Sequence, residues 1–367
     1  MAQARLISVD VFRGLTVAAM VLVNNPGSWT FVYPPLRHAA WHGWTPTDLI
    51  FPFFLFIVGM SIALSMGRRV EEGQTGLRLT GKILKRSAMI FALGLFLHLF
   101  PKFRFATMRI PGVLQRIAVC FLFGALIYLK VKPRTRLAAA VLLLVLYGAL
   151  LTLVPVPGYG PGVLEPQGNL CGYVDTLLLR GHLYKPDFDP EGLVSTLPAI
   201  VTVLLGTLAG DLLRARRTDR RKTLVFLGLG LALTAAGLFA GRYHPINKPL
   251  WTSTYVVFTA GAALLVFAAL FALFERDRVR WLAWPFRVLG TNAIVVFAGS
   301  ALMVKAILLI KIHDAGKTVS PITYAYAHWL SPLAGPYLGS LLYPLALLLF
   351  WVLIIWPLYR NRIFIKL

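Results

Sequence analysis

The sequence predicts an all-α membrane protein, a polytopic helical bundle with about ten transmembrane helices. Of the 367 residues, 58% are hydrophobic and only 14% are charged, and the mean hydropathy is +0.73. A soluble domain of this length could not bury so much apolar surface. The apolar residues also gather into runs of about 20, the length needed to cross a hydrocarbon core of about 30 Å.

Ten apolar runs qualify as membrane spans, and polar or breaker-rich segments separate them. In chain order the expected spans are Leu15–Phe31, Asp48–Met66, Ile83–Phe100, Val113–Leu129, Leu137–Val154, Leu193–Leu213, Thr223–Ala240, Ser253–Phe274, Phe286–Ile310 and Tyr337–Tyr359. Because all ten follow one another with mostly short connections, we expect a single transmembrane domain over 1–367. The first run is followed by no small-residue cleavage site, so we do not expect a cleaved signal peptide.

The positive charge, formally +23 in total, is distributed unevenly between the loops. With a cytoplasmic N-terminus and alternating spans, 25 of the 37 Lys and Arg residues fall on the cytoplasmic side, 11 on the other side and Arg116 inside a span. Such a bias is typical of cytoplasmic loops. We therefore expect both termini and the loops Arg68–Arg86 and Arg214–Lys222 to be cytoplasmic. These loops would lie against anionic lipid, and no nucleic acid is expected as a partner.

The stretch RHAAWHGWTPTDLIFPFFLFIVG, residues Arg37–Gly59, is the centre of the prediction. It places His38, His42 and Asp48 at the mouth of the second span. An ionisable group at the edge of hydrocarbon is costly and is usually paired or functional. An imidazole, whose ordinary pKa is about 6.5, suits a general base near neutral pH.

Two other interpretations of these histidines remain open from the residues alone. His38 and His42 are four apart, so on a helix they would share a face and could bind a metal together with Asp48. HAAWH lacks the internal glutamate of HExxH, however, and Pro34-Pro35 favours an irregular backbone, so no metal is expected. The histidines could also be interfacial residues without any chemistry.

Polar residues at the start of the first span suggest a second site. Asp10 and Arg13 lie three apart, share a helix face and can pair, with Arg5 nearby in the same segment. One interpretation is a topological anchor with a neutralised carboxylate. The other is a site for an anionic cytoplasmic ligand, because a guanidinium is well shaped for phosphate.

Further polar groups lie at the ends of spans or inside them. Asn24, in the breaker cluster NNPG, either lines a polar cavity or simply ends a helix. Gln115 and Arg116 lie inside the fourth span, where arginine either reaches the interface or points inward to a ligand. Arg287 and Asn292 offer the same choice in the ninth span.

The longest connection, 155–192, is rich in Gly, Pro and acidic residues and is expected to form an external cap. The stretches HPINKPLW, His244–Trp251, and YAYAHWLSP around His328 would face the same side. Acidic and aromatic side chains around a mouth suit a sugar or another polyhydroxylated acceptor, although aromatic residues are also ordinary at membrane interfaces.

In combination, these stretches resemble the heparan-α-glucosaminide N-acetyltransferase family, membrane enzymes that use cytoplasmic acetyl-CoA to acetylate a sugar across the bilayer. The matching stretches run in order from Ser8 to Leu367. They are SVDVFRGL, the Asn24 region, RHAAWHGWTPTDLIFPFFLFIVG, GVLQRIAVCF, GYVDTLLLRGHLY with DPEG, INKPLW and YRNRIFIKL. Animal members carry a long luminal domain before the first motif, and we expect this chain to be a bacterial member in the cytoplasmic membrane.

The resemblance implies a role for each matched residue. It makes His38 the catalytic base or acetyl carrier, with Asn24 as its partner and Asp48 beside it. The residues expected to bind acetyl-CoA, as co-substrate, are Asp10, Arg13, Gln115, Arg116 and Asn292. The residues expected to bind an amino sugar or sugar hydroxyl are Asp175, Asn247, Lys248 and Trp251. The other expected partners are the lipid bilayer and a second copy of the chain in a homodimer.

Two other classes of function fit the same residues. A secondary transporter of a sugar or organic anion could use His38, Asp48 and Arg116 as a proton and substrate relay. A scaffold component of envelope-polysaccharide assembly would tolerate the loss of His38. Within the acetyltransferase hypothesis, direct transfer and an acetyl-histidine intermediate both remain open.

Overall fold

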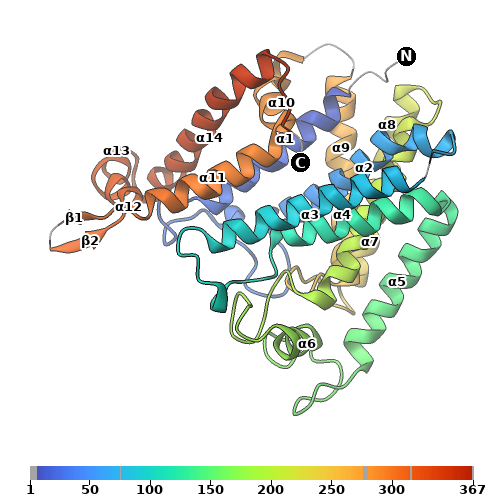
Figure 1. Ribbon diagram of the computed structural model, residues 1–367, viewed down its shortest axis with the longest axis horizontal. Coiled ribbons are helices and arrows are strands. Elements are labelled where there is room, and N and C mark those ends of the chain that lie inside the picture. The colour runs from blue at the N-terminus through green and yellow to red at the C-terminus, as the bar shows by residue number, and fades with distance from the viewer. Residues whose placement is uncertain (1–5, 75, 276–279, 315, 366–367) are drawn as a thin grey trace.

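The computed structural model describes residues 6–74, 76–275, 280–314 and 316–365 and is almost entirely helical (Figure 1). The predictions that involve Arg5, the loop residues 276–279, and Lys366 with Leu367 fall outside these ranges. The longer helices are α1 (Ile7–Asn24), α2 (Ile50–Glu71), α3 (Leu77–Leu99), α4 (Val113–Lys130), α5 (Pro133–Leu153), α7 (Leu193–Arg214), α8 (Asp219–Ala240), α9 (Ser253–Phe274), α11 (Ala293–Ile307) and α14 (Pro336–Arg360). The shorter ones are α6 (Leu170–Leu179), α10 (Trp284–Thr291), α12 (Pro321–Ala325) and α13 (Ser331–Ala334).

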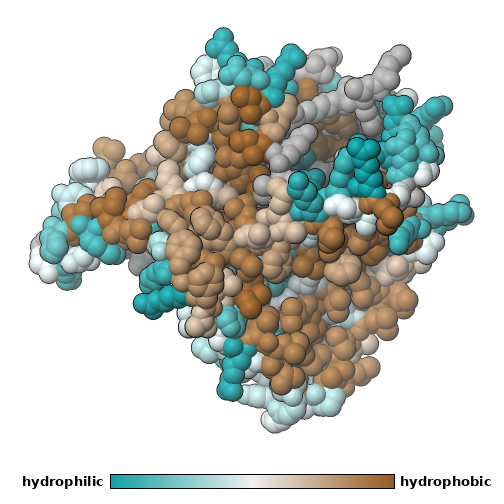
Figure 2. Space-filling model, in the orientation of Figure 1, coloured by the Kyte–Doolittle hydropathy of each residue, from teal (hydrophilic) through white to brown (hydrophobic). Residues whose placement is uncertain are grey.

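The β-sheet of the described residues is a two-stranded antiparallel hairpin, made of β1 (Ile312–Asp314) and β2 (Lys317–Val319). Together with α12 and α13 it projects from the left edge of the bundle in this view, whereas α6 lies at the bottom (Figure 1). The face drawn in Figure 2 carries a broad band of apolar residues, with hydrophilic residues gathered at its margins. This surface is that of a multi-pass membrane protein.

Eight of the described helices are long and apolar enough to cross a membrane, and α10 with α11 make a ninth if the bent pair is one span. The sequence predicts ten. The difference lies in α3, where the run Ile83–Phe100 is the C-terminal part of a helix that begins at Leu77. Its first half carries Arg78, Lys82, Lys85 and Arg86, which is too much charge for a plain apolar span.

The first helix differs most from its predicted limits, because it begins at Ile7 instead of Leu15 and ends at Asn24 instead of Phe31. At its start, Oε1 of Glu275 accepts hydrogen bonds from the backbone N–H of Ser8 (2.9 Å) and from its hydroxyl (2.8 Å). Asp10 is buried and forms an ion pair with Arg13 at 3.3 Å, so both charges are tolerated inside the helix. The predicted span, whose limits were set by hydropathy, left out this polar first part of α1.

The ninth predicted span, Phe286–Ile310, is broken at Asn292, where the axes of α10 and α11 meet at 70°. The short helix α10 packs backbone to backbone on α1. A Cβ on Gly14 would lie 1.8 Å from the carbonyl oxygen of Phe286, and one on Gly290 would lie 2.0 Å from that of Asp10. Glycine is therefore required at both positions.

The helices α2 and α7 form the packed centre of the bundle. A Cβ on Gly59 would lie 2.0 Å from the carbonyl oxygen of Val203, and one on Gly206 would lie 2.1 Å from that of Phe56. Small residues at such crossings let helix backbones approach closely in membranes. The position of α2 is thereby fixed against α7.

The bundle has two ends with different loops. At the basic end α2, α4, α7 and α14 terminate, and the short connections carry most of the Arg and Lys residues. At the loop end α2, α4, α7 and α9 begin, and residues 25–49, 100–112, 154–192 and 241–252 lie there. The connection 154–192 is anchored to the loop end by Arg109, whose guanidinium pairs with Asp189 (2.6 Å) and Glu191 (2.5 Å).

Candidate active site and cavity

The loop before α2 joins His38 to Asp48. Thr45 and Asp48 form a capping box on the 3₁₀ turn Pro46–Leu49 that leads into α2. Asp48 Oδ2 accepts hydrogen bonds from the backbone N–H groups of Ala39 (3.0 Å) and Thr45 (3.1 Å), and Oδ1 lies 2.6 Å from His38 Nδ1. One buried carboxylate therefore fixes both the loop and the imidazole.

This arrangement determines which nitrogen of His38 can act as a base. At 2.6 Å from a carboxylate, Nδ1 carries the proton and donates it to Asp48, so Nε2 keeps its lone pair. The side chain of His38 is 54% exposed, whereas that of Asp48 is only 2% exposed. An accessible imidazole oriented by a buried carboxylate is the arrangement found in general-base catalysis.

Lys248 completes the group from the connection between α8 and α9. Its Nζ lies 3.3 Å from Asp48 Oδ1 and 3.1 Å from His38 Nδ1. Burial lowers the pKa of Lys248, and the negative charges of Asp48 and Glu191 act in the opposite direction. Because Nδ1 of His38 directs its proton to Asp48, it cannot accept a hydrogen bond from Lys248. The ammonium of Lys248 therefore pairs with the Asp48 carboxylate, and this ion pair compensates the buried negative charge of Asp48.

Trp251 supports this group and is not exposed to a ligand. Its ring is buried and packs edge-on against Phe51 and Tyr255, with 5.2 Å between ring centroids in both pairs. The Tyr255 hydroxyl donates to the backbone oxygen of Asp48 at 2.6 Å. Trp251 was expected to contact the acceptor, but its position makes it part of the packing behind Asp48.

Asp175 and Asn247, also expected to bind the acceptor, are buried and form hydrogen bonds within the protein. Asp175 is fully buried and accepts a hydrogen bond from the Leu193 backbone N–H at 2.8 Å. Burial raises the pKa of Asp175 to about 6, although this hydrogen bond acts in the opposite direction. Asn247 is buried and its amide joins the Trp41 carbonyl (3.0 Å) to the Leu250 N–H (2.7 Å). Of the four residues expected at the acceptor, Lys248 alone contacts His38 within the described chain.

Asn24 is exposed at the last position of α1, and its side chain makes no hydrogen bond with another described residue. The neighbouring Asn25 side chain donates to the Val21 carbonyl at 2.7 Å and so ends the helix. The structure therefore places Asn24 at the loop end without joining it to His38.

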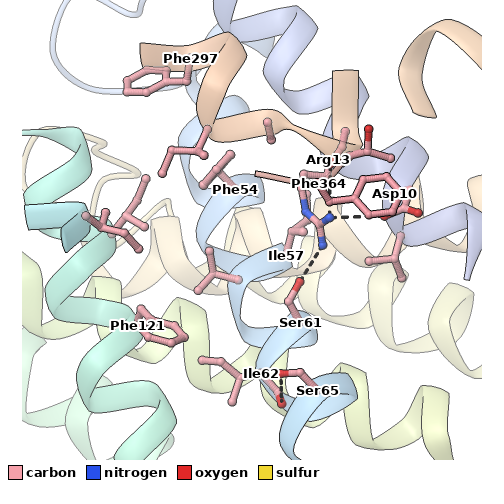
Figure 3. A pocket seen from close by; sticks show the side chains of 18 of the residues that line it. Asp10, Arg13, Phe54, Ile57, Ser61, Ile62, Ser65, Phe121, Phe297 and Phe364 are labelled. Atoms are coloured by element: carbon pink, nitrogen blue, oxygen red, sulfur yellow. Dashed lines mark hydrogen bonds and ion pairs between the residues drawn. The ribbon is translucent and has the colours of Figure 1, made fainter. Parts of the chain in front are cut away.

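A cavity of about 590 Å³ lies beside α2. One part of its lining is polar and includes Asp10, Arg13, Ser61 and Arg86. Arg13 donates to Asp10 Oδ1 (3.3 Å), to Ser61 Oγ (2.9 Å) and to the Gly290 carbonyl (3.3 Å), as Figure 3 shows for the first two. The rest of the lining is mostly apolar and includes Phe54, Ile57, Val58, Ile90, Ile117 and Phe297.

Arg86, from α3, is the second guanidinium at this cavity. It lies over the Phe121 ring at 4.9 Å from the centroid and forms no ion pair with a carboxylate of the described residues. Neither Arg86 nor Ser61 was expected at a binding site. Their signal in the sequence is only that each is polar within or beside an apolar helix.

Gln115 and Arg116 do not line this cavity, although they were expected to bind the same ligand as Arg13. Arg116 is buried at the loop end, where it donates to the Gly192 carbonyl (3.1 Å) and the Ser195 hydroxyl (2.5 Å). The Gln115 amide lies 3.4 Å from His98 Nδ1. Both side chains join α4 to its neighbours, although Gln115 Oε1 and Arg116 Nε and Nη1 are buried without a hydrogen-bond partner among the described residues.

Asn292 reaches the cavity indirectly. Its Nδ2 donates to the Ile363 carbonyl (3.1 Å), and its Oδ1 accepts from the Ile365 N–H (2.8 Å). Phe364, between these two residues, and Ile365 line the cavity.

The helix α2 connects the two sites. Asp48 lies just before α2, and seven residues of the helix between Phe54 and Ser65 line the cavity. At a rise of about 1.5 Å per residue, Phe54 lies about 9 Å along the axis from Asp48. No group of three His, Cys, Asp or Glu side chains among the described residues is placed to hold a metal ion.

Comparison with known proteins gives a consistent relationship over the chain. The family model described as heparan-alpha-glucosaminide N-acetyltransferase, catalytic, matches residues 5–242. The human heparan-alpha-glucosaminide N-acetyltransferase is 31% identical and the mouse protein 29% identical, each alignment covering 99% of this chain. The chain spans about 60% of the length of these curated relatives.

Proposed function

Because the chain belongs to the heparan-alpha-glucosaminide N-acetyltransferase family, we propose that it is a membrane acetyltransferase acting from acetyl-CoA on an amino sugar or a sugar hydroxyl. The observation that carries this proposal is the His38–Asp48 pair, an accessible imidazole held by a buried carboxylate. The same helix that follows Asp48 forms one side of a cavity with two guanidinium groups.

The cavity is the proposed site of the donor. Arg13 and Arg86 would pair with the phosphates of CoA, for which guanidinium groups are suited. The apolar lining would receive the pantetheine arm and direct the thioester towards the loop end. The donor would enter from the basic end, which we place in the cytoplasm of a bacterial cell because basic loops favour that side.

The acceptor would approach His38 from the loop end. As the acceptor amine or hydroxyl attacks the thioester carbonyl, Nε2 of His38 takes its proton, and Asp48 stabilises the resulting imidazolium. The C–S bond then breaks and the proton passes from His38 to the departing thiolate. Asn24, if it turns towards this carbon, would donate to the oxyanion, a contact worth about 3–4 kcal/mol in other enzymes.

The test is transfer of labelled acetyl from acetyl-CoA to glucosamine by the protein in liposomes. His38→Ala should lower turnover by about 10²–10⁴-fold, the usual contribution of general acid–base catalysis. His42→Ala is the matched control, because His42 lies on the same loop but contacts Asn247 and Glu165 instead of Asp48. Near-normal turnover by a folded His38→Ala protein would refute the mechanism. Sugar uptake without acetylation would instead indicate a secondary transporter.

If His38 carries the acetyl group covalently, rapid quenching should trap labelled acetyl on the protein in the absence of acceptor. Direct transfer leaves the protein unlabelled under the same conditions. His38→Ala controls for acetylation at other residues, so the two routes are separated by one measurement.

A further inference from the structure

The end of the described chain returns across the bundle to the cavity. After α14 ends at Arg360, the backbone turns through Arg362, whose φ is +55°, and continues as the extended segment 363–365. The side chains of Ile363 and Ile365 are 48% and 45% exposed, whereas Phe364 is less exposed and lines the cavity.

Asn292 holds this segment in place. Its side-chain amide binds the backbone on both sides of Phe364, through the Ile363 carbonyl and the Ile365 N–H. Asn292 itself is only 1% exposed. Because both polar atoms of the amide are engaged by the tail, Asn292 acts on the cavity through the position of Phe364.

Phe364 lies at the charged part of the cavity. It lines the cavity together with Asp10 and Arg13, and Figure 3 shows the three labelled side chains together at one end. In acyl-CoA the phosphates and the only aromatic ring, adenine, belong to the same nucleotide. An aromatic side chain beside a guanidinium matches that combination, because the ring can stack on a base while the guanidinium binds phosphate.

We propose that Phe364 is a specificity-determining residue of the donor site that stacks on the adenine of CoA, and that Asn292 is the residue that positions it. This inference rests on the proposed function, since it names the part of the donor that the tail recognises. The pantetheine arm and the acetyl group lie beyond the reach of Phe364.

The experiment measures KM and kcat of the full-length protein with two donors, acetyl-CoA and acetylpantetheine, which lacks the nucleotide. Phe364→Ala should raise the KM for acetyl-CoA about tenfold, the loss of one aromatic stack, with little change in kcat or in the KM for acceptor. Phe364→Trp, which keeps an aromatic ring, should have a KM for acetyl-CoA close to that of the wild type. With acetylpantetheine, wild type and Phe364→Ala should have the same KM. Leu353→Ala, on the exposed side of α14, is the control for changes that do not touch the cavity.

Asn292 is tested by a double-mutant cycle. Asn292→Ala should raise the KM for acetyl-CoA as Phe364→Ala does, and the double variant should be no worse than either single variant. If the two single-variant increases in the KM for acetyl-CoA multiply in the double variant, Asn292 contacts the donor itself, and its positioning role is overturned. If Asn292→Ala does not fold, Asn292→Asp serves, because it keeps the acceptor for Ile365 and loses the donor to Ile363.

Equal KM changes with both donors, or none with acetyl-CoA, would overturn the role of Phe364. Binding of CoA to the detergent-solubilised wild type, measured by calorimetry, separates this from the proposed function. A wild type that binds CoA and transfers acetyl, with a Phe364→Ala variant of unchanged KM, refutes the inference alone. A wild type that does neither refutes both.

Discussion

Asp48 is the residue whose surroundings define the candidate active site. Its carboxylate contacts His38 Nδ1, the backbone N–H groups of Ala39 and Thr45, and Lys248 Nζ. The sequence places His38 and Asp48 on one loop, so their association is predictable. Lys248 comes from a connection 200 residues after Asp48, and its contact with His38 and Asp48 depends on the packing of α9 against the start of α2.

Asp48→Asn should reduce acetyl transfer by about 10²–10⁴-fold, because an amide can donate to Nδ1 and reverse the tautomer that leaves Nε2 free. Turnover of glucosamine acetylation is the measurement. Asp187→Asn, at an exposed aspartate of the cap, is the matched control and should be neutral.

Since Asp48→Asn leaves Lys248 without its carboxylate, the double variant with Lys248→Met should recover thermal stability but not activity. Full activity of Asp48→Asn would contradict the assigned tautomer.

Asp175 should make the protein less stable as pH rises. Its pKa in the folded state is about 6, above the ordinary 3.8, because burial penalises the charged carboxylate. The folded state therefore holds this proton more tightly than the unfolded state does. That contribution, about 3 kcal/mol for a shift of this size, is complete below the ordinary pKa and is lost as pH rises through about 6.

Thermal unfolding in detergent at pH 4 to 8 tests this prediction. Asp175→Asn keeps an acceptor for the Leu193 N–H and has no charge to bury. Relative to the variant, the wild type should lose stability between pH 4 and 7 and remain constant above that. A difference that does not depend on pH would show that the carboxyl has no raised pKa.

At the scale of the elements, the limits of plain apolar helices follow from hydropathy, and those of interrupted ones do not. The eighth predicted span, Ser253–Phe274, coincides with α9, and Leu193–Leu213 ends one residue short of α7. The first and ninth spans differ because α1 contains an ion pair and the α10–α11 pair is bent. Both irregularities lie at the cavity, where polar groups replace continuous apolar sequence.

Gly206→Ala should destabilise the protein by about 1–3 kcal/mol, the usual cost of overpacking, because its Cβ would meet the Phe56 carbonyl at 2.1 Å. Gly228→Ala is the matched control in α8, where nothing lies within 4 Å of the added Cβ. It should be neutral or gain about 0.5–1 kcal/mol from the better helix former. Thermal unfolding compares the two. Equal stabilities would mean that α2 and α7 are not in backbone contact.

At the scale of the whole molecule, the arrangement of the cavity could not be read from the sequence. Its lining comes from α1, α2, α3, α4, the α10–α11 pair and the tail, which are far apart along the chain. Arg13 was identifiable because it begins an apolar run, whereas Arg86 is one of several basic residues in α3. Phe364 was contained in the matched motif YRNRIFIKL, but only the fold shows where its side chain is placed.

The two ends of the bundle should face opposite sides of the membrane. Gln74 is exposed at the basic end and Lys185 is exposed in the cap at the loop end. In a variant with Cys120 and Cys171, both buried, replaced by alanine, Lys185→Cys should react with an impermeant maleimide in intact cells. Gln74→Cys should react only after permeabilisation. The reverse pattern would invert the proposed route of the donor.

The break between α10 and α11 has a consequence for the membrane potential. The helix α10 has 8 residues and is about 12 Å long, less than half of a hydrocarbon core, and the cavity lies against the break at Gly290 and Ala293. If water and ions fill the cavity from the basic end, the voltage falls across the remaining thickness and not along the cavity. A charge that crosses the full field exchanges about 2.3 kcal/mol per 100 mV. The multiply charged donor would cross little of that field, so its KM in liposomes should hardly change when a potassium diffusion potential is imposed.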